Sequence, residues 1–248
     1  MTKLCLIGYG KMGHMIAEMA ESHDCVVVST IDPTQGSSFK EITAEALADA
    51  DVCIDFSHPG VVLNNIRATL ALGRNLVVGT TGWNGALEEV RELTLSTGTG
   101  LLYGANYSIG MNLFSRIIAD ASSLFDKFPG YDVFGYEIHH RQKADSPSGT
   151  ALELCDKILS HSSRKDSAVY EKLNRRPESH ELHFASVRGG NVPGTHVVTF
   201  DAEADSIELI HRVRSRSGFA SGALLGAKWL AGKKGFFSFS EMISEIIC

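Results

Sequence analysis

A short segment near the middle of the chain combines residue types that could transfer a proton beside a bound anion. Residues 136–150 contain His139, His140 and Lys143, and they end in Ser148-Gly149-Thr150. Histidine exchanges protons near neutral pH, and a helix that begins at such a turn offers N–H groups to a carboxylate. Buried charges are costly unless paired. So dense a cluster of ionisable groups therefore favours a functional site over a core strand.

A glycine-rich loop near the N-terminus is a second candidate site. It reads Gly8-Tyr9-Gly10-Lys11-Met12-Gly13, follows an apolar run and opens an amphipathic segment. In dinucleotide-binding folds the three glycines allow a tight turn, close approach of a pyrophosphate and close packing of the helix. Asp32 lies at roughly the 20-residue offset expected for the acid that binds a ribose. The alternative is that Asp32 only caps the turn before Pro33.

The residues around Asp32 also bear on cofactor choice. A carboxylate at this position accepts hydrogen bonds from the ribose hydroxyls of NADH and repels the 2′-phosphate of NADPH. Pro33 and Thr34 follow the acid, so no basic residue stands directly after it, and Lys11 remains the candidate phosphate partner. We therefore expect NADH to serve at least as well as NADPH.

The first hundred residues alternate strand-like and helix-like segments, which predicts an α/β fold with a doubly wound parallel sheet of Rossmann type. The expected strands are Lys3–Ile7, Cys25–Ile31, Val52–Asp55, Asn75–Val78 and Gly100–Tyr103, and the expected helices are Lys11–Ser22, Ile42–Asp49, Val61–Leu72 and Ala86–Leu95. From Asn112–Phe125 onward, a helix precedes strands that follow one another, which predicts an α+β domain with a mixed or antiparallel sheet. Its strands are expected at Val133–His139, Leu182–Val187, Thr195–Asp201 and Ile207–Val213, with a helix at Ala151–Leu159 and a loop with partial structure at Ser160–His180. A last helix is expected at Ala220–Ala231.

Composition is that of a globular protein. The chain has 248 residues, 44% of them hydrophobic and 21% charged, with a net charge of −6. That charge gives no electrostatic reason to expect nucleic acid, and no apolar run reaches the roughly 18 residues of a membrane span. The cysteines are few and scattered, which fits a reducing cytoplasm: Cys5, Cys25, Cys53, Cys155 and Cys248.

The segment from Glu137 to Thr150 fits the pattern E-x-H-H-x-x-K-x-D-x-P-S-G-T at every fixed position. In this it resembles the 4-hydroxy-tetrahydrodipicolinate reductase (dihydrodipicolinate reductase) family of diaminopimelate and lysine biosynthesis. The resemblance extends to most of the chain, namely Gly8–Gly13, Asp55–Ser57, Gly79–Gly82, Asn106–Gly110 and Arg216 onward.

The resemblance implies a dinucleotide-binding domain of residues 1–107 and 216–248, and a substrate-binding and oligomerisation domain of residues 108–215. It implies hydride transfer from NADH or NADPH to ring C4 of a dicarboxylate substrate, with His139 and Lys143 as proton donors, and a homotetramer. The implied substrate ligands are His140, Ser148, Gly149, Thr150 and Arg216. The implied cofactor contacts are Gly8, Tyr9, Gly10, Lys11, Met12, Gly13, Asp32, Phe56, Gly79, Thr80, Thr81, Gly104, Ala105, Asn106 and Tyr107.

Other interpretations remain open from the residues themselves. The glycine turns at 79–82 and 104–107 could be plain turns, and the two histidines could be exposed residues at a strand edge. We expect no metal, because adjacent histidines splay apart and no carboxylate or third histidine shows ligand spacing nearby. His183 and His196 could face each other across strands, but we expect them to be solvated strand residues.

Two rival functions remain. One is another small-acid dehydrogenase on the same scaffold, such as an aspartate or semialdehyde dehydrogenase. The latter needs a nucleophilic cysteine, and Cys155 lies within an expected helix. The other rival is a redox-sensing protein that binds NAD without turnover. Neither accounts for the whole segment from Glu137 to Thr150.

Overall fold

The structure is a computed structural model that describes residues 1–34 and 36–247, and it divides into two compact units. Unit 1 comprises Met1–Ile109 and Arg216–Cys248, and unit 2 comprises Gly110–Ser215. Ile109 packs against the core of unit 1, so the first crossing between units falls two residues beyond the boundary expected after residue 107. Cys248 lies outside the described residues, and the other four cysteines are free and buried.

Unit 1 is built on a parallel sheet of six strands in the order β11-β5-β4-β3-β1-β2. The strands are β1 (Thr2–Ile7), β2 (Cys25–Ile31), β3 (Val52–Asp55), β4 (Asn75–Val78), β5 (Gly100–Tyr103) and β11 (Gly235–Ser238). The helical segments are α1 (Lys11–Met19), η1 (Glu21–His23), α2 (Ala44–Leu47), α3 (Val62–Ala71), η2 (Asn84–Ala86), α4 (Leu87–Thr97), α7 (Ser217–Leu230) and α8 (Phe239–Ile247). This is the Rossmann-type arrangement expected from the sequence.

Helices cover both faces of this sheet, as a parallel sheet requires. Successive residues of β1 point to opposite faces: Leu4 and Leu6 join the core beneath α1, α7 and α8, whereas Cys5 and Ile7 join the core beneath α2, α3 and α4. The strand carboxyl ends and the loops that follow them remain available for ligands.

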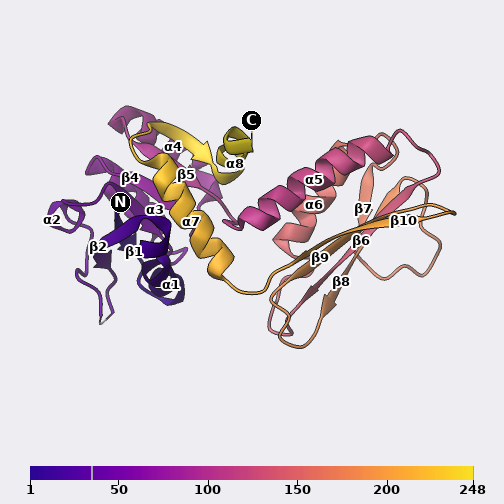
Figure 1. Cartoon of the computed structure of the whole chain (residues 1–248), viewed down its shortest axis with the longest axis horizontal. Helices are drawn as coiled ribbons and strands as arrows, with labels where there is room; N and C mark the ends of the chain where they lie inside the picture. The colour runs from indigo at the N-terminus through magenta and orange to yellow at the C-terminus, as the bar shows by residue number, and fades with distance from the viewer. Residues whose placement is uncertain (35, 248) are drawn as a thin grey trace. The chain divides into compact units, whose positions relative to one another are not determined.

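Unit 2 contains a mixed sheet in the order β10-β9-β6-β8-β7, with two helices on one face (Figure 1). Its elements are α5 (Ile109–Phe125), β6 (Asp132–His139), α6 (Gly149–Ser160), β7 (Ser167–Val169), β8 (Glu181–Arg188), β9 (Thr195–Asp201) and β10 (Ser206–Arg212). Strand β6 pairs parallel with β8 and antiparallel with β9. The expected α+β unit with a mixed sheet is therefore confirmed.

Alternation along β6 decides which side chains face the helices. Val133, Glu137 and His139 are buried on the side that α5 and α6 cover, whereas Phe134 is 40% exposed on the opposite side. Val187 on β8 and Ile210 on β10 are also exposed apolar side chains. One face of the sheet thus carries the ionisable residues of the motif, and the other is partly apolar.

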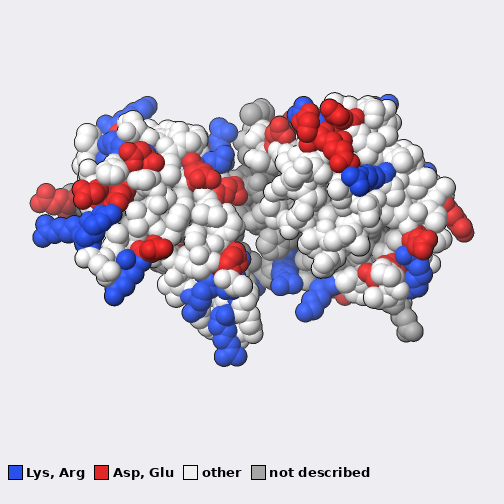
Figure 2. Space-filling view, turned by 180° about the vertical axis from the view of Figure 1, so that it is seen from behind, with Lys and Arg blue, Asp and Glu red and all other residues white. Residues whose placement is uncertain are grey.

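Strand β11 and helix α8, which follow α7, were not expected from the sequence. Strand β7 lies within Ser160–His180, which was expected to be a loop with partial structure. None of the described helices is both long and apolar enough to span a bilayer. On the face seen in Figure 2, acidic and basic side chains are interspersed with wide uncharged areas.

Candidate active site and cofactor cavity

The glycine-rich loop of unit 1 adopts the geometry that a bound dinucleotide requires. Gly8 has a φ of +88°, and a Cβ there would collide with the carbonyl oxygen of Phe56. A Cβ on Gly13 would collide with the carbonyl oxygen of Gly8, whereas one on Gly10 would meet nothing within 4 Å. The turn and the close packing of α1 therefore explain two glycines, and the third keeps the loop open beside the N-terminus of α1.

Asp32 lies at the end of β2 and holds the glycine loop and its own turn together. Its Oδ2 accepts a hydrogen bond from the Tyr9 N–H at 2.8 Å. Its Oδ1 accepts from the N–H of Thr34 at 2.9 Å and from its hydroxyl at 2.6 Å. The hydroxyl and N–H of Thr34 lower the pKa of Asp32, so the carboxylate is ionised at neutral pH.

A cavity of about 660 Å³ lies against Asp32, and its lining includes Gly8, Gly10, Lys40, Phe56 and Asn65. Lys40 was not singled out from the sequence. It follows Asp32 by eight residues, and its ammonium lies near Thr34 and Ser37. Its positive charge also lowers the pKa of Asp32. The cavity thus presents an acid and a base side by side.

A second buried acid, Asp55, organises the loops that follow β3 and β4. Its Oδ1 accepts from the Thr80 hydroxyl at 2.6 Å and from the Ser57 hydroxyl at 2.7 Å, and its Oδ2 accepts from Asn65 Nδ2 at 2.8 Å. Burial raises the pKa of Asp55 against the effect of these donors. The hydroxyl of Thr80 is therefore engaged within the protein rather than directed to a ligand.

The position of the Phe56 ring requires a glycine at position 79. The Phe56 ring lies so close to Gly79 that a Cβ at that position would overlap it, and the ring is partly buried at the cavity. Tyr107 is 1% exposed, and its hydroxyl donates to the carbonyl oxygens of Val78 and Leu102. Its side chain is therefore a core group, and only its backbone is left for a cofactor contact.

The remaining predicted cofactor residues lie on the same loops. Lys11 begins α1 and is exposed, Met12 packs against the core, and Thr81 is exposed. Asn106 Oδ1 accepts a hydrogen bond from the Ser108 N–H at 2.9 Å. Gly104 and Ala105 line a small cavity with Thr80 and Thr81.

In unit 2, Glu137 is a fully buried carboxylate at the centre of the motif. Its Oε1 accepts from the Ser148 N–H, the Ser186 hydroxyl and Arg188 Nη2, each at 2.8 Å. Its Oε2 accepts from the Ser148 hydroxyl. Burial raises the pKa of Glu137, but His196, Ser148 and Arg188 together outweigh it, and the pKa lies well below its ordinary value.

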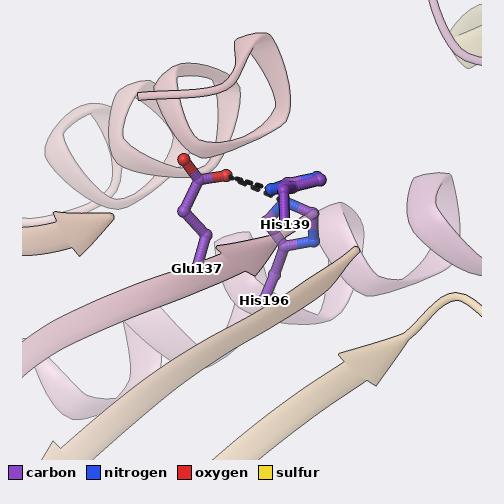
Figure 3. Close-up of side chains that lie close together, drawn as sticks. All are labelled: Glu137, His139 and His196. Atoms are coloured by element: carbon purple, nitrogen blue, oxygen red, sulfur yellow. Dashed lines mark ion pairs between the residues drawn. The ribbon is translucent and has the colours of Figure 1, made fainter. Parts of the chain in front are cut away.

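His139 lies two residues beyond Glu137 on the same face of β6, and the two side chains meet (Figure 3). His139 Nδ1 is 3.0 Å from Glu137 Oε2, although the ring nitrogen is not well aligned for a hydrogen bond. Catalytic contacts of this kind are often loose until a ligand binds. Burial lowers the pKa of His139 to about 4, partly opposed by the charge of Glu137. The imidazole is therefore neutral at pH 7 in the free protein.

His196 is the residue that the sequence placed wrongly. It is 3% exposed rather than solvated, because β9 pairs it directly with Glu137. Its Nε2 lies 3.6 Å from Glu137 Oε2, and its ring packs edge-on against His139 with centroids 5.2 Å apart. It does not face His183, which pairs with Val169 of β7. A single histidine in an alternating strand gave no signal of this pairing.

The structure also corrects the argument against a metal. Ligand atoms of Glu137, His139 and His196 lie within 4.8 Å of one another, so a carboxylate and a third histidine are close to the motif after all. However, Arg188 already pairs with Glu137 at 2.8 Å, and a neighbouring cation disfavours a second one. The absence of a metal remains a prediction.

The rest of the motif forms a compact loop and a helix start. Lys143 is 25% exposed and pairs with Asp145 at 2.8 Å, and the His140 N–H donates to the Val192 carbonyl oxygen. Ser148 caps α6 by accepting from the Ala151 N–H. Because its own N–H and hydroxyl both donate to Glu137, its donors are committed, and Gly149 and Thr150 are left to present the first N–H groups of the helix.

Arg216 belongs to unit 1, where it precedes the first residue of α7 and is exposed. The predicted substrate ligands therefore come from both units. Glu137, His139, Ser148 and Arg188 form one cluster, called here the Glu137 cluster. His140 adjoins it next to His139, and Gly149 and Thr150 adjoin it after Ser148. The role of Arg216 remains a prediction.

Comparison with known proteins yields one consistent set of relatives. Residues 2–107 match the family model described as "Dihydrodipicolinate reductase, N-terminus", and residues 110–243 match its C-terminus model. Proteins named 4-hydroxy-tetrahydrodipicolinate reductase from Christiangramia forsetii and Staphylococcus carnosus are 34% and 33% identical to this chain. The alignment with the first relative covers 98% of this chain and 98% of that protein. The alignment with the second covers 97% of this chain and 99% of that protein. A dipicolinate-bound dihydrodipicolinate reductase from Paenisporosarcina sp. TG-14 has the same fold, with a TM-score of 0.78 at 23% identity over 98% of this chain and 99% of that one.

Proposed function

The chain belongs to the dihydrodipicolinate reductase family, and on that premise we propose that it reduces 4-hydroxy-tetrahydrodipicolinate to tetrahydrodipicolinate with the residues of the Glu137 cluster. It is an NAD(P)-dependent oxidoreductase of diaminopimelate and lysine biosynthesis. The observation that carries the proposal is the union, in unit 2, of a buried imidazole, an ammonium and a helix start within one motif.

His139 and Lys143 supply protons in this proposal, and the helix start binds a carboxylate. The C4 hydroxyl leaves as water together with a ring hydrogen, the nicotinamide cofactor would supply the hydride that adds to ring C4, and the donated proton completes the reduction. Release of the Lys143 ammonium from Asp145, with which it pairs at 2.8 Å, frees it to contact a substrate carboxylate. The N–H groups of Gly149 and Thr150 receive a carboxylate at the positive end of α6, and His140 lines the same loop.

The cofactor binds at the glycine loop in this scheme. Asp32 accepts hydrogen bonds from the ribose hydroxyls of NADH, while Lys40 and Lys11 offer positive charge to the 2′-phosphate of NADPH. We therefore propose that both NADH and NADPH are used. Phe56, Gly79, Thr81 and the 104–107 backbone lie at the strand ends where a nicotinamide ring binds in such sheets.

The apolar face of the unit 2 sheet supports a homotetramer assembled through that face. Phe134, Val187 and Ile210 are 40%, 49% and 38% exposed there. Exposed apolar patches of this kind commonly mark interfaces. The free, buried thiols of the described chain suit an enzyme of the cytoplasm, where thiols stay reduced.

The test is to mix the protein with freshly generated 4-hydroxy-tetrahydrodipicolinate and follow NADH absorbance. Substrate-dependent loss of NADH supports the proposal. Binding of NADH without turnover would instead favour a redox-sensing protein. A semialdehyde dehydrogenase is disfavoured already, because Cys155 is fully buried and burial raises its pKa to about 12.

A further inference from the structure

Glu137 contacts both halves of the candidate substrate site, and the reaction scheme above gives it no task. It is fully buried and ionised, and it accepts from donors in two places, namely Ser186 and Arg188 of β8 and Ser148, the residue that caps α6. A buried carboxylate with this many donors is costly to desolvate and is strongly fixed in position once they are in place.

We propose that Glu137 is a positioning residue that sets the His139 imidazole and the first turn of α6 relative to each other. The inference rests on the proposed function, because it assigns Glu137 a role in that same site. A single carboxylate would then align the proton donor with the bound carboxylate of the substrate.

The geometry at His139 carries the first half of the argument. Glu137 Oε2 lies 3.0 Å from Nδ1, so the other ring nitrogen, Nε2, is the one turned away from the carboxylate. A carboxylate at one ring nitrogen fixes the tautomer and stabilises the imidazolium, which leaves the other nitrogen to exchange a proton. A Cβ at Gly194 would lie only 3.1 Å from Nε2, so the glycine keeps that nitrogen uncrowded.

Ser148 carries the second half. Its N–H and hydroxyl both donate to Glu137, and the same hydroxyl accepts from the Ala151 N–H in the first turn of α6. Any displacement of the carboxylate is therefore transmitted to the helix start where Gly149 and Thr150 present their N–H groups. Gln at position 137 would keep the size but would place an NH₂ group against one set of these donors.

Several charged or titratable groups face His139. They are Glu137 on β6, Arg188 on β8, His196 on β9 and Lys143 in the loop after β6. Of these, only Glu137 raises the pKa of His139, and the other three lower it. Loss of its charge should therefore lower the pKa of His139 further.

The experiment compares Glu137→Gln with Ser186→Ala in the full-length protein. The Ser186 hydroxyl donates to Glu137 Oε1 at 2.8 Å, on the side away from His139, so this variant loses a donor while the carboxylate charge remains. In Glu137→Gln we expect kcat to fall about 100-fold, as for loss of an effective general acid, and the high-pH limit of activity to move to lower pH. Affinity for pyridine-2,6-dicarboxylate, measured by calorimetry, should fall as well. Ser186→Ala should leave the pH limit in place.

The His139 imidazole nitrogen shifts provide a readout that needs no turnover. In histidine-labelled protein they should report a lower pKa in Glu137→Gln than in the wild type. An unchanged pKa together with unchanged dicarboxylate affinity would overturn the positioning role. If the wild type fails to oxidise NADH with substrate while the imidazole shifts change as expected, the proposed function fails and the positioning role stands.

A second variant covers the case in which Glu137→Gln does not fold. Ser148→Ala removes the hydroxyl that joins Glu137 to the Ala151 N–H, but it keeps the N–H of residue 148 and leaves the carboxylate beside His139. Dicarboxylate affinity should fall in this variant while the high-pH limit stays where it is. A shift of the limit without loss of affinity would show that Glu137 does not couple the two halves.

Discussion

Dicarboxylate binding should be accompanied by proton uptake at His139, because the free imidazole is neutral and the ligand brings negative charge. Its pKa is lowered to about 4 in the free protein. A ligand carboxylate about 4 Å away contributes about 4 kcal/mol to the imidazolium at an effective dielectric constant near 20. Since one pKa unit corresponds to about 1.4 kcal/mol, the pKa in the complex rises to about 7.

Proton uptake makes the affinity for the dicarboxylate depend on pH. The complex binds the extra proton and the free protein does not, so affinity for pyridine-2,6-dicarboxylate is flat above about pH 7. Below that pH it rises, approaching tenfold for each unit of acidification, as long as the carboxylates of the ligand stay ionised, which holds above about pH 5. The donor is thus charged by the ligand that it serves.

Calorimetric titrations at about pH 6.5, in buffers of different protonation enthalpy, measure this uptake. With a complex pKa of about 7, about 0.75 proton should be taken up per site. His139→Gln should take up far less. If the wild type takes up no proton, or if His139→Gln takes up as many as the wild type, then dicarboxylate binding does not raise the pKa of His139.

Three further changes test separate parts of the site. Gly194→Ala should push the His139 ring from its position and lower kcat at least about tenfold, while NADH binding is retained. Gly189→Ala is the control and should behave as wild type, because a Cβ there would meet nothing within 4 Å. Equal kinetics in both variants would show that the Nε2 atom of His139 is not used. Asp32→Ala should lower the ratio of kcat/KM for NADH over NADPH about tenfold, since a charged hydrogen bond is worth roughly 1.5–3 kcal/mol, and an unchanged ratio would place the ribose elsewhere. Thr150→Val should lower kcat/KM roughly 10- to 150-fold with little change in Tm; a sharp drop in Tm with normal binding of pyridine-2,6-dicarboxylate would mark Thr150 as a structural residue.

The sequence predicted the unit 1 sheet well because each strand there has a local signal. Cys25–Ile31, Val52–Asp55, Asn75–Val78 and Gly100–Tyr103 were expected with the same bounds that the structure shows. A buried parallel strand is a continuous apolar run, and the run fixes its ends. Strand β11 was not predicted, because Gly235–Ser238 is short and half-buried and is followed directly by a helix that begins with an apolar residue.

Pairing across strands explains what the sequence could not reveal in unit 2. The motif identified His139, but the neighbours that determine its pKa arrive from β8 and β9, as Arg188 and His196. Nothing local distinguishes His196 from an exposed strand histidine, because only register with Glu137 buries it. Likewise Ser148 could be recognised as part of a helix start, but the commitment of its donors to Glu137 is a tertiary contact.

Unit 2 is an insertion within unit 1, because the chain leaves unit 1 after Ile109 and returns at Arg216. The core on one face of the unit 1 sheet includes Ala223 and Leu224 of α7 and Met242 of α8. During synthesis, β1–β5 therefore emerge with that face covered only by α1, and α7 and α8 are added after all of unit 2 has been made. Unit 2 carries its own core and can fold while unit 1 waits. We expect a chain that stops before residue 216 to retain a folded second unit and to aggregate through the exposed sheet of the first.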